Sequence, residues 1–333
     1  MPSLRVGLTM GDPAGIGPEI VLRALAALAQ RPMAAGMVVI GCAATLRATA
    51  AALGMAAPAV EIEDVGPAPA PVRTGVASAA GGEIAYRAVA RAVDLAMAGR
   101  IAAIVTAPLA KEALAMAGRP YPGHTELLAE LTGVSGPVMM LAHGDFRVSH
   151  LTTHIALRDV PDRLTPERLD RVLALTHDAL ATLGIAAPRI AVAALNPHAG
   201  EGGMFGREDM TVTEPLTARW RAMGRRVDGP IPGDTVFVKM RAGQYDAVVA
   251  MYHDQGHVPV KLLGFDIDPV TGAMRALSGV NVTLGLPIIR TSVDHGTAFD
   301  IAGKGVASAD SMVEAIDYAV AMATRGGGLL KAG

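Results

Sequence analysis

The chain has 333 residues, of which 51% are hydrophobic, and its formal net charge is -2. A chain of this length is large enough to divide its core, so we expect two lobes with a cleft. The near-neutral charge and the aromatic content of only 3% exclude the basic surface and the base-stacking platform of a nucleic-acid-binding protein.

Targeting and membrane features are not expected. The first ten residues lack the charged region, apolar stretch and cleavage site of a signal peptide, so a cytoplasmic protein is expected. Apolar runs such as residues 37–42 are far shorter than the roughly twenty residues that span a bilayer. The single cysteine, Cys42, cannot form an internal disulfide, and its apolar surroundings predict a buried, unreactive thiol.

Short apolar runs alternate with helical patterns along the whole chain. The expected strands are residues 5–9, 38–41, 60–65, 102–106, 189–195 and 247–252, and the expected helices are 18–30, 44–54, 111–118, 166–183 and 308–324. This alternation is typical of βαβ units. The sequence therefore predicts an α/β fold built on a mostly parallel sheet.

A glycine-rich turn follows the first expected strand, at residues 11–19. Its proline is placed to open a helix, which suits an anion at a helix N-terminus. The turn completes neither the GxGxxG nor the P-loop pattern. A tight structural turn and a ligand loop both remain open.

Three histidines stand where strand-like runs end, namely His154, His198 and His253. They lie 44 and 55 residues apart, which excludes a compact zinc finger but suits ligands from separate strands. A catalytic metal site typically has three protein ligands and one open position. A single histidine is more commonly an ordinary polar residue, so the pattern alone leaves both interpretations open.

Further polar residues form a candidate anion site. Lys261, Asn281 and Arg290 suit an anion clamp, because Arg binds carboxylate or phosphate bidentately and Lys acts as a compact charge. His124 opens an expected helix that Thr125 is placed to cap, so His124 is a candidate to face an anion. Ordinary surface charge is the alternative for each of these residues.

Candidate proton carriers are Asp254, Asp234 and His295. The two aspartates are also candidates to orient a metal-bound histidine. Turn and capping roles are the alternative for both.

Five segments together resemble the 4-hydroxythreonine-4-phosphate dehydrogenase family of vitamin B6 synthesis. These segments are residues 11–20, 123–126, 196–203, 252–256 and 281–298. The resemblance runs along nearly the whole chain. It implies a two-lobed α/β/α fold like that of isocitrate and isopropylmalate dehydrogenases, without the usual dinucleotide fingerprint.

The resemblance also implies a domain division and an assembly. It places residues 1–130 and 296–333 in a first lobe and residues 131–295, with the metal ligands, in a second. It implies a homodimer whose active site lies in the cleft and at the subunit interface, with His253 donated by the partner chain. It further implies NAD or NADP and a divalent metal, with zinc expected ahead of magnesium, cobalt, manganese or nickel.

Site residues follow from the same resemblance. The metal ligands fall on His154, His198 and His253, and the substrate contacts fall on His124, Thr125, Lys261, Asn281 and Arg290. The resemblance does not identify the nicotinamide-binding residues.

Two departures from the family bear on the substrate. Residues 262–280 form a longer segment than expected, and His257 stands where an apolar residue is usual. Both resemble catabolic relatives such as the decarboxylating dehydrogenase of terephthalate cis-1,2-dihydrodiol. Two substrates stay open, that dicarboxylate and 4-phosphohydroxy-L-threonine, and the altered segment slightly favours the dicarboxylate.

Both candidate substrates carry a hydroxyl group β to a carboxylate, so the expected reaction is oxidation followed by loss of CO2. A metal ion chelated by the substrate would lower the hydroxyl pKa. Two other classes compete. A metal-dependent hydrolase would use the same three histidines to activate water, and a ligand-binding protein would show no turnover.

Overall fold

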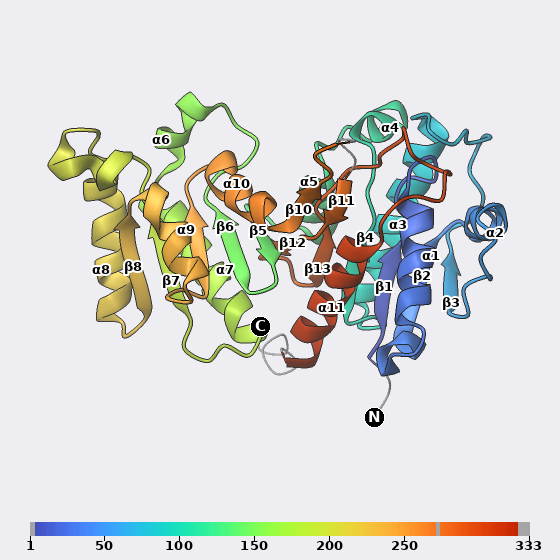
Figure 1. The fold of residues 1–333 in the computed structure, drawn as a ribbon, viewed down its shortest axis with the longest axis horizontal. Helices are drawn as coiled ribbons and strands as arrows, with labels where there is room; N and C mark the ends of the chain where they lie inside the picture. Colours follow the sequence, from blue (N-terminus) through green and yellow to red (C-terminus); the bar gives the residue numbers. More distant parts are fainter. Residues whose placement is uncertain (1–3, 271–273, 326–333) are drawn as a thin grey trace. The chain divides into compact units, whose positions relative to one another are not determined.

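The computed structural model describes residues 4–270 and 274–325, and it contains two compact α/β units (Figure 1). Within these ranges the first unit holds residues 4–137 and 266–324, and the second unit holds residues 138–265 and 325. The predicted α/β class is therefore confirmed. No helix in the described part of the chain is long and apolar enough to cross a membrane.

The described part of the first unit contributes six strands to the large sheet. Their order is β3 (Glu61–Asp64), β2 (Met37–Gly41), β1 (Val6–Thr9), β4 (Ala103–Thr106), β13 (Ile289–Val293) and β12 (Val280–Leu284). Neighbouring strands are parallel except β12, which runs antiparallel to β13. The register places Arg290 opposite Ile104 and Ser292 opposite Thr106.

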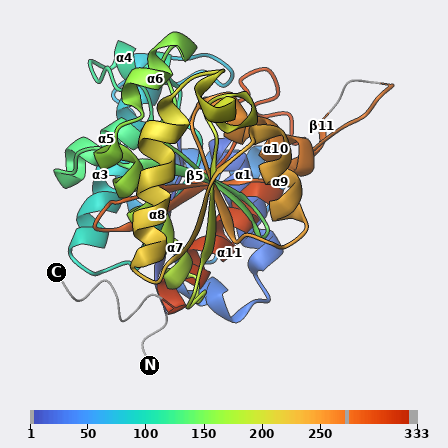
Figure 2. The same ribbon diagram turned by 90° about the vertical axis from the view of Figure 1, so that its left-hand side faces the viewer.

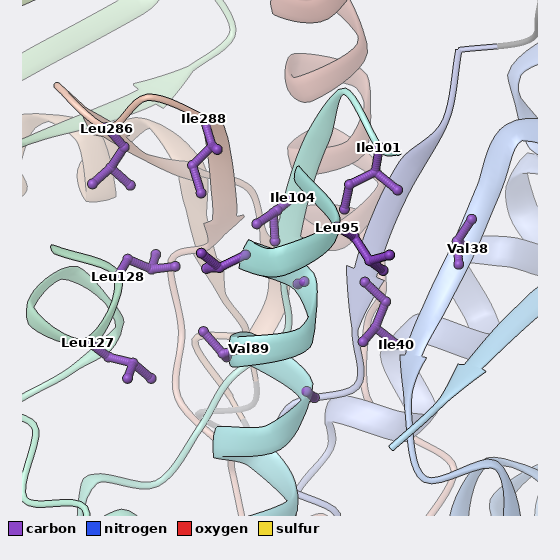
Figure 3. Packing of buried hydrophobic residues seen from close by; sticks show 13 residues of the cluster. Val38, Ile40, Val89, Leu95, Ile101, Ile104, Leu127, Leu128, Leu286 and Ile288 are labelled. Atoms are coloured by element: carbon purple, nitrogen blue, oxygen red, sulfur yellow. The ribbon is translucent and has the colours of Figure 1, made fainter. Parts of the chain in front are cut away.

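Helices of the first unit bury apolar faces against these strands. They are α1 (Gly17–Leu28), η1 (Pro32–Gly36), α2 (Ala43–Ala52), α3 (Ala79–Met97), α4 (Lys111–Met116), α5 (His124–Thr132) and α11 (Asp310–Arg325). Val89 and Leu95 of α3 pack with Ile40 of β2 and Ile104 of β4 in one buried cluster (Figure 3). Full burial of each such side chain contributes roughly 1.5–3 kcal/mol.

The second unit is built on five strands. Their order is β5 (Val138–His143), β6 (Phe146–His150), β9 (Ala247–Ala250), β7 (Arg189–Ala193) and β8 (Arg226–Ile231). β5 and β6 form an antiparallel hairpin, and the other pairs are parallel. β6, β9 and β7 are neighbours and run parallel. The segments that follow these three strands therefore leave the sheet at one edge.

Helices lie on both faces of these strands (Figure 2). They are η2 (Leu157–Asp159), α6 (Val160–Arg163), α7 (Pro166–Thr182), η3 (Pro197–Gly203), η4 (Asp209–Thr213), α8 (Glu214–Ala222), α9 (Gly233–Arg241) and α10 (His253–Gly264). A separate pair of short strands, β10 (Phe265–Ile267) and β11 (Met274–Leu277), follows α10.

Most strands and helices expected from periodicity are present within a few residues of their predicted bounds. The unit boundary differs from the expected one. Residues 131–137, 266–270 and 274–295 are expected in the second lobe, but they belong to the first unit, where β13 pairs with β4 over a long sequence separation. Cys42 is buried, in agreement with its expected inert role.

Candidate functional site

The second unit holds all three predicted metal ligands. His154 follows β6, His253 begins α10 directly after β9, and His198 follows β7. These are the three adjacent strands of that unit, so local folding brings the segments that carry the histidines to one edge of the sheet.

His154 and His253 lie close together, with ring centroids 5.8 Å apart. Two imidazoles that bind one ion through nitrogens about 2.1 Å from it would have centroids about 5–6 Å apart. The His253 Nδ1 lies 2.7 Å from the Asp254 Oδ1 and donates to that carboxylate. The same hydrogen bond lowers the pKa of Asp254. Asp254 thus leaves the His253 Nε2 as the nitrogen available to a metal.

His198 lies in a left-handed turn. Its φ is 52°, and Ala199 and Glu201 have φ values of 56° and 44°. Each residue with a Cβ in this region costs about 1–3 kcal/mol, so the surroundings must impose the conformation. The buried Asp209 supplies such a restraint, because its two carboxylate oxygens accept from the Leu195 and Asn196 amides, each at 2.9 Å.

A cavity of about 710 Å³ opens beside this turn. Its polar lining comprises Asn196, His198, Asp234, Tyr252, Asp254 and Gln255, and its apolar lining includes Phe237, Val258, Pro259 and Leu262. Two of the three expected proton carriers, Asp234 and Asp254, therefore face one cavity together with a predicted metal ligand. The third, His295, belongs to the first unit, where burial lowers its pKa.

Among the residues that the structure describes, no three His, Cys, Asp or Glu side chains come together as a metal site. His253, which the family resemblance assigned to the partner's site, lies beside His154 of its own chain. One chain therefore brings together two of the three predicted ligands.

Two further histidines lie behind His253. The His257 ring stacks on the His253 ring with centroids 3.6 Å apart, and the His150 ring lies 4.7 Å from that of His257. His150 is fully buried. Burial and the neighbouring His257 lower the pKa of His150 to about 3, and burial and His253 lower the pKa of His257 to about 4. Both rings are therefore neutral near neutral pH.

The first unit holds a buried cation. Arg290 on β13 is 2% exposed, and its Nη1 and Nη2 donate to Thr283 Oγ1 at 2.9 Å and Thr106 Oγ1 at 2.6 Å. Within residues 4–270 and 274–325, no carboxylate pairs with this guanidinium. Burial lowers the pKa of Arg290 to about 9, so the group stays charged at neutral pH.

Unsatisfied polar atoms accompany Arg290 in this unit. The Arg290 Nε, the Asn281 Oδ1 and the His124 Nε2 are buried and have no hydrogen-bond partner in the described part of the chain. Burial, and then the charge of Arg290, lower the pKa of His124 well below its usual value. Buried polar groups normally have partners, so the charged Arg290 with its unpaired Nε–H is suited to binding an anionic ligand.

Two predicted substrate contacts remain, Thr125 and Lys261. Thr125 is the second residue of α5, whose N-cap is Gly123, so Thr125 is not the expected cap. Lys261 lies on α10 in the second unit, with its Nζ 5.4 Å from the centre of the Phe265 ring. Lys261 and Arg290 therefore belong to different units.

The glycine-rich turn after β1 is a structural turn. Gly11 has φ 72°, and a Cβ there would lie 2.3 Å from the Pro108 carbonyl oxygen. Burial raises the pKa of Asp12, and the buried Glu19 accepts from the Ala307 amide at 3.0 Å. Two buried acidic side chains make this helix N-terminus a poor anion site.

Sequence reasoning did not identify Thr106, Thr283 or Asp209. Thr106 ends an apolar strand, which was a usable signal, because polar residues at the carboxyl ends of parallel strands commonly face ligands. The roles of Thr283 and Asp209 depend on contacts between segments that no local pattern reveals.

Comparison with known sequences identifies relatives along nearly the full length. A family model described as pyridoxal phosphate biosynthetic protein PdxA matches residues 20–319. A Bradyrhizobium diazoefficiens protein with the provisional name D-threonate 4-phosphate dehydrogenase is 60% identical, and the match covers 97% of this chain and 98% of that protein. The D-threonate 4-phosphate dehydrogenase of Salmonella typhimurium is 46% identical, with 97% and 100% covered.

Solved structures agree with this assignment. A 4-hydroxythreonine-4-phosphate dehydrogenase from Klebsiella pneumoniae has a TM-score of 0.82 at 45% identity, covering 96% of this chain and 100% of that one. A terephthalate 1,2-cis-dihydrodiol dehydrogenase from Burkholderia xenovorans has a TM-score of 0.68 at 32% identity, covering 96% and 98%. The family resemblance seen in the sequence is confirmed, and the chain belongs to the PdxA family of pyridoxal phosphate biosynthetic proteins.

Proposed function

We propose that the protein is an NAD-linked, divalent-metal-dependent dehydrogenase that oxidises and decarboxylates a phosphorylated four-carbon hydroxy acid. D-threonate 4-phosphate is the first candidate substrate, and 4-phosphohydroxy-L-threonine is the second. The observation that carries the proposal is the fully buried Arg290 guanidinium, which lies among hydroxyl groups and buried unsatisfied polar atoms.

Arg290 is the proposed binding group for the substrate phosphate. A buried unpaired charge is costly, and a bidentate phosphate or carboxylate is the partner that best offsets this cost. The neutral His124, whose pKa the Arg290 charge helps to lower, adds a polar group near the cation. The Thr106 and Thr283 hydroxyls hold the guanidinium in a fixed plane, which favours a ligand of matching geometry.

The identity of the relatives supports a phosphorylated substrate. The relative at 60% identity carries a name that refers to D-threonate 4-phosphate, whereas the dihydrodiol dehydrogenase is only 32% identical. We therefore do not adopt the slight preference for the dicarboxylate that the longer segment at residues 262–280 suggested.

His154, His198 and His253 are the proposed metal ligands, and their donor chemistry suits zinc and similar divalent ions. Two observations support the fit. The rings of His154 and His253 lie 5.8 Å apart, and Asp254 fixes the tautomer of His253. When bound, such an ion supplies Lewis-acid polarisation of a substrate oxygen.

A homodimer is part of the proposal, because one chain gathers only two of the three ligands. We assign His154 and His253 to one chain and the third ligand, His198, to its partner. Exposed apolar side chains support an interface on α10, where Leu262 is 80% exposed and Val258 is 60% exposed four residues earlier. Exposed apolar groups that lie together commonly mark protein contacts.

The reaction follows from the substrate's chemistry. Oxidation removes a proton from the C3 hydroxyl and a hydride from C3, and a nicotinamide cofactor accepts the hydride. The product is a β-keto acid, which loses its carboxylate as CO2 and takes up a proton. Asp254 and Asp234 are the proposed proton carriers, because both are carboxylates that face one cavity.

The direct test is NADH formation from three compounds, D-threonate 4-phosphate, 4-phosphohydroxy-L-threonine and terephthalate cis-1,2-dihydrodiol. NADH with stoichiometric CO2 on a phosphorylated acid, dependent on added divalent metal, supports the proposal. A higher kcat/KM on the dihydrodiol would reject the phosphorylated substrate. Metal-dependent hydrolysis without NADH would favour the competing hydrolase class.

A further inference from the structure

His253 and His257 form a stacked pair on the first turns of α10. They lie four residues apart, on one face of the helix, where side chains are neighbours. Their ring centroids are only 3.6 Å apart, and the two planes differ by 12°. The His253 ring therefore has a flat neighbour along one face.

His257 is itself held in one orientation. Its Nδ1 lies 2.9 Å from the His253 carbonyl oxygen and donates to it. The residue is 7% exposed, so its ring has little room to turn. This hydrogen bond directs the His257 side chain toward the N-terminus of the helix, where it contacts the His253 ring.

His150 supports this arrangement from the interior. It is fully buried, its Nδ1 donates to the Met139 carbonyl oxygen at 3.3 Å, and its ring lies 4.7 Å from that of His257. A Cβ on Gly256 would lie 2.3 Å from the His150 Nε2, so His150 packs directly on the helix backbone. The row from His150 through His257 to His253 is continuous within the second unit.

His253 is consequently restrained on two sides. Asp254 binds its Nδ1, and His257 covers one ring face. The Nε2 is the nitrogen left for an external partner, and the centroid of the His154 ring lies 5.8 Å from that of the His253 ring.

We propose that His257 is a positioning residue, which fixes the ring plane of His253 by stacking and so presets the Nε2 for metal binding. The inference deepens the proposed function and rests on its metal site. A leucine side chain at this position would fill the space. It offers neither a flat face nor a donor to the His253 carbonyl.

Metal affinity is the readout that separates positioning from general stability. The full-length His257→Leu protein should bind Zn²⁺ about tenfold to a hundredfold more weakly than the unaltered protein, the usual loss when a residue that orients a ligand is removed. Competition with a chromophoric chelator measures this affinity. His257→Phe keeps a flat ring against His253 and should recover most of the loss.

Co²⁺ supplies a second readout, because its visible spectrum reports ligand geometry. The His257→Leu protein should show a shifted and weaker Co²⁺ spectrum, and the His257→Phe protein should resemble the unaltered one. His177→Leu, a substitution on α7 away from these rings, is the matched control and should change neither readout. Circular dichroism and sedimentation must show that each variant is folded and has an unchanged oligomeric state.

The outcomes distinguish the inference from the function on which it rests. If His253→Ala abolishes Zn²⁺ binding but His257→Leu and His257→Phe both bind as tightly as the unaltered protein, the positioning role is overturned and the metal site stands. If His253→Ala itself retains full Zn²⁺ affinity, the proposed metal site fails, and the inference fails with it. If His257→Leu does not fold, weak binding by a folded His257→Phe protein would also overturn the stacking account.

Discussion

The Nη2 of Arg290 lies 2.6 Å from the Oγ1 of Thr106, so a neutral hydroxyl occupies the place where a buried guanidinium usually meets a carboxylate. Arg290 is 2% exposed and lies on β13, directly beside the strand that ends in Thr106. A buried charge without a partner destabilises the folded protein. In the proposed function, the substrate supplies the missing anion.

Removal of the Arg290 charge should affect the free and ligand-bound protein differently. Arg290→Met should leave the free energy of unfolding without ligand at least as high as in the unaltered protein, because an unpaired buried charge is lost. The same variant should lose the stabilisation given by inorganic phosphate, which for a ligand at a hundred times its Kd is about 2.7 kcal/mol. Thermal unfolding with and without phosphate measures both effects.

Arg47→Met, an exposed substitution on α2 of the same unit, is the control and should retain the phosphate effect. A full phosphate effect in Arg290→Met would show that the anion binds elsewhere.

Single substitutions of the proposed metal ligands should abolish turnover without unfolding the chain. His154→Ala, His198→Ala and His253→Ala should each reduce metal retention, because each removes one of three ligands. Metal content after dialysis and activity after chelator treatment provide the measurements. Full activity in metal-stripped protein would contradict the assignment.

Mixed dimers should show which ligands one chain supplies. With His154 and His253 in one chain, a heterodimer of His154→Ala and His198→Ala subunits keeps one complete site and should regain activity. A heterodimer of His154→Ala and His253→Ala subunits should stay inactive. The reverse pattern would place His253 across the interface, as the family resemblance implied, and inactivity of both verified heterodimers would reject shared ligation.

The turn that carries His198 should depend on Asp209. Asp209→Asn replaces an acceptor with a donor opposite two buried amides, so it should lower the free energy of unfolding by about 1–3 kcal/mol. It should also weaken metal binding, because the turn no longer holds His198. Denaturant unfolding and chelator competition test the two effects, and Glu214→Gln, at an exposed position on the following helix, should change both much less.

Acid stability should reflect the buried His150. Its folded pKa is about 3 against an ordinary value of 6.5, so the unfolded chain binds more protons between these values. Stability is therefore fully present above pH 6.5 and is lost as the pH falls toward 3. In metal-free protein, His150→Phe should reduce the slope of unfolding free energy against pH by at most about 1.4 kcal/mol per pH unit. An unchanged slope would show that His150 is protonated in the folded state.

Local patterns in the sequence were sufficient to predict most of the strands and helices. The βαβ periodicity predicted β1, β2, β4, β7 and β9, because buried parallel strands are continuous apolar runs. His154, His198 and His253 are metal-ligand candidates because ligands commonly bind where such strands end, and this role stays a prediction. The neighbours of these residues were not predictable.

The missing information lies in long-range pairing. The contact of Arg290 with Thr106 joins residues 184 positions apart, and it exists only because β13 inserts beside β4. The same pairing places residues 274–295 in the first unit. The stack of His257 on His253 is local, but its backing by His150 depends on how β6 packs against α10. The periodicity of apolar residues within one segment does not predict contacts between distant segments.

The most direct test of the central claim is a steady-state assay of NADH and CO2 formation from D-threonate 4-phosphate, with and without a divalent metal. We predict one NADH and one CO2 per substrate consumed, no turnover after metal removal, and a kcat/KM at least a hundredfold above that for terephthalate cis-1,2-dihydrodiol. Such a ratio corresponds to about 2.7 kcal/mol of transition-state binding. Equal or greater kcat/KM on the dihydrodiol, or undiminished turnover in metal-free protein, would contradict the account.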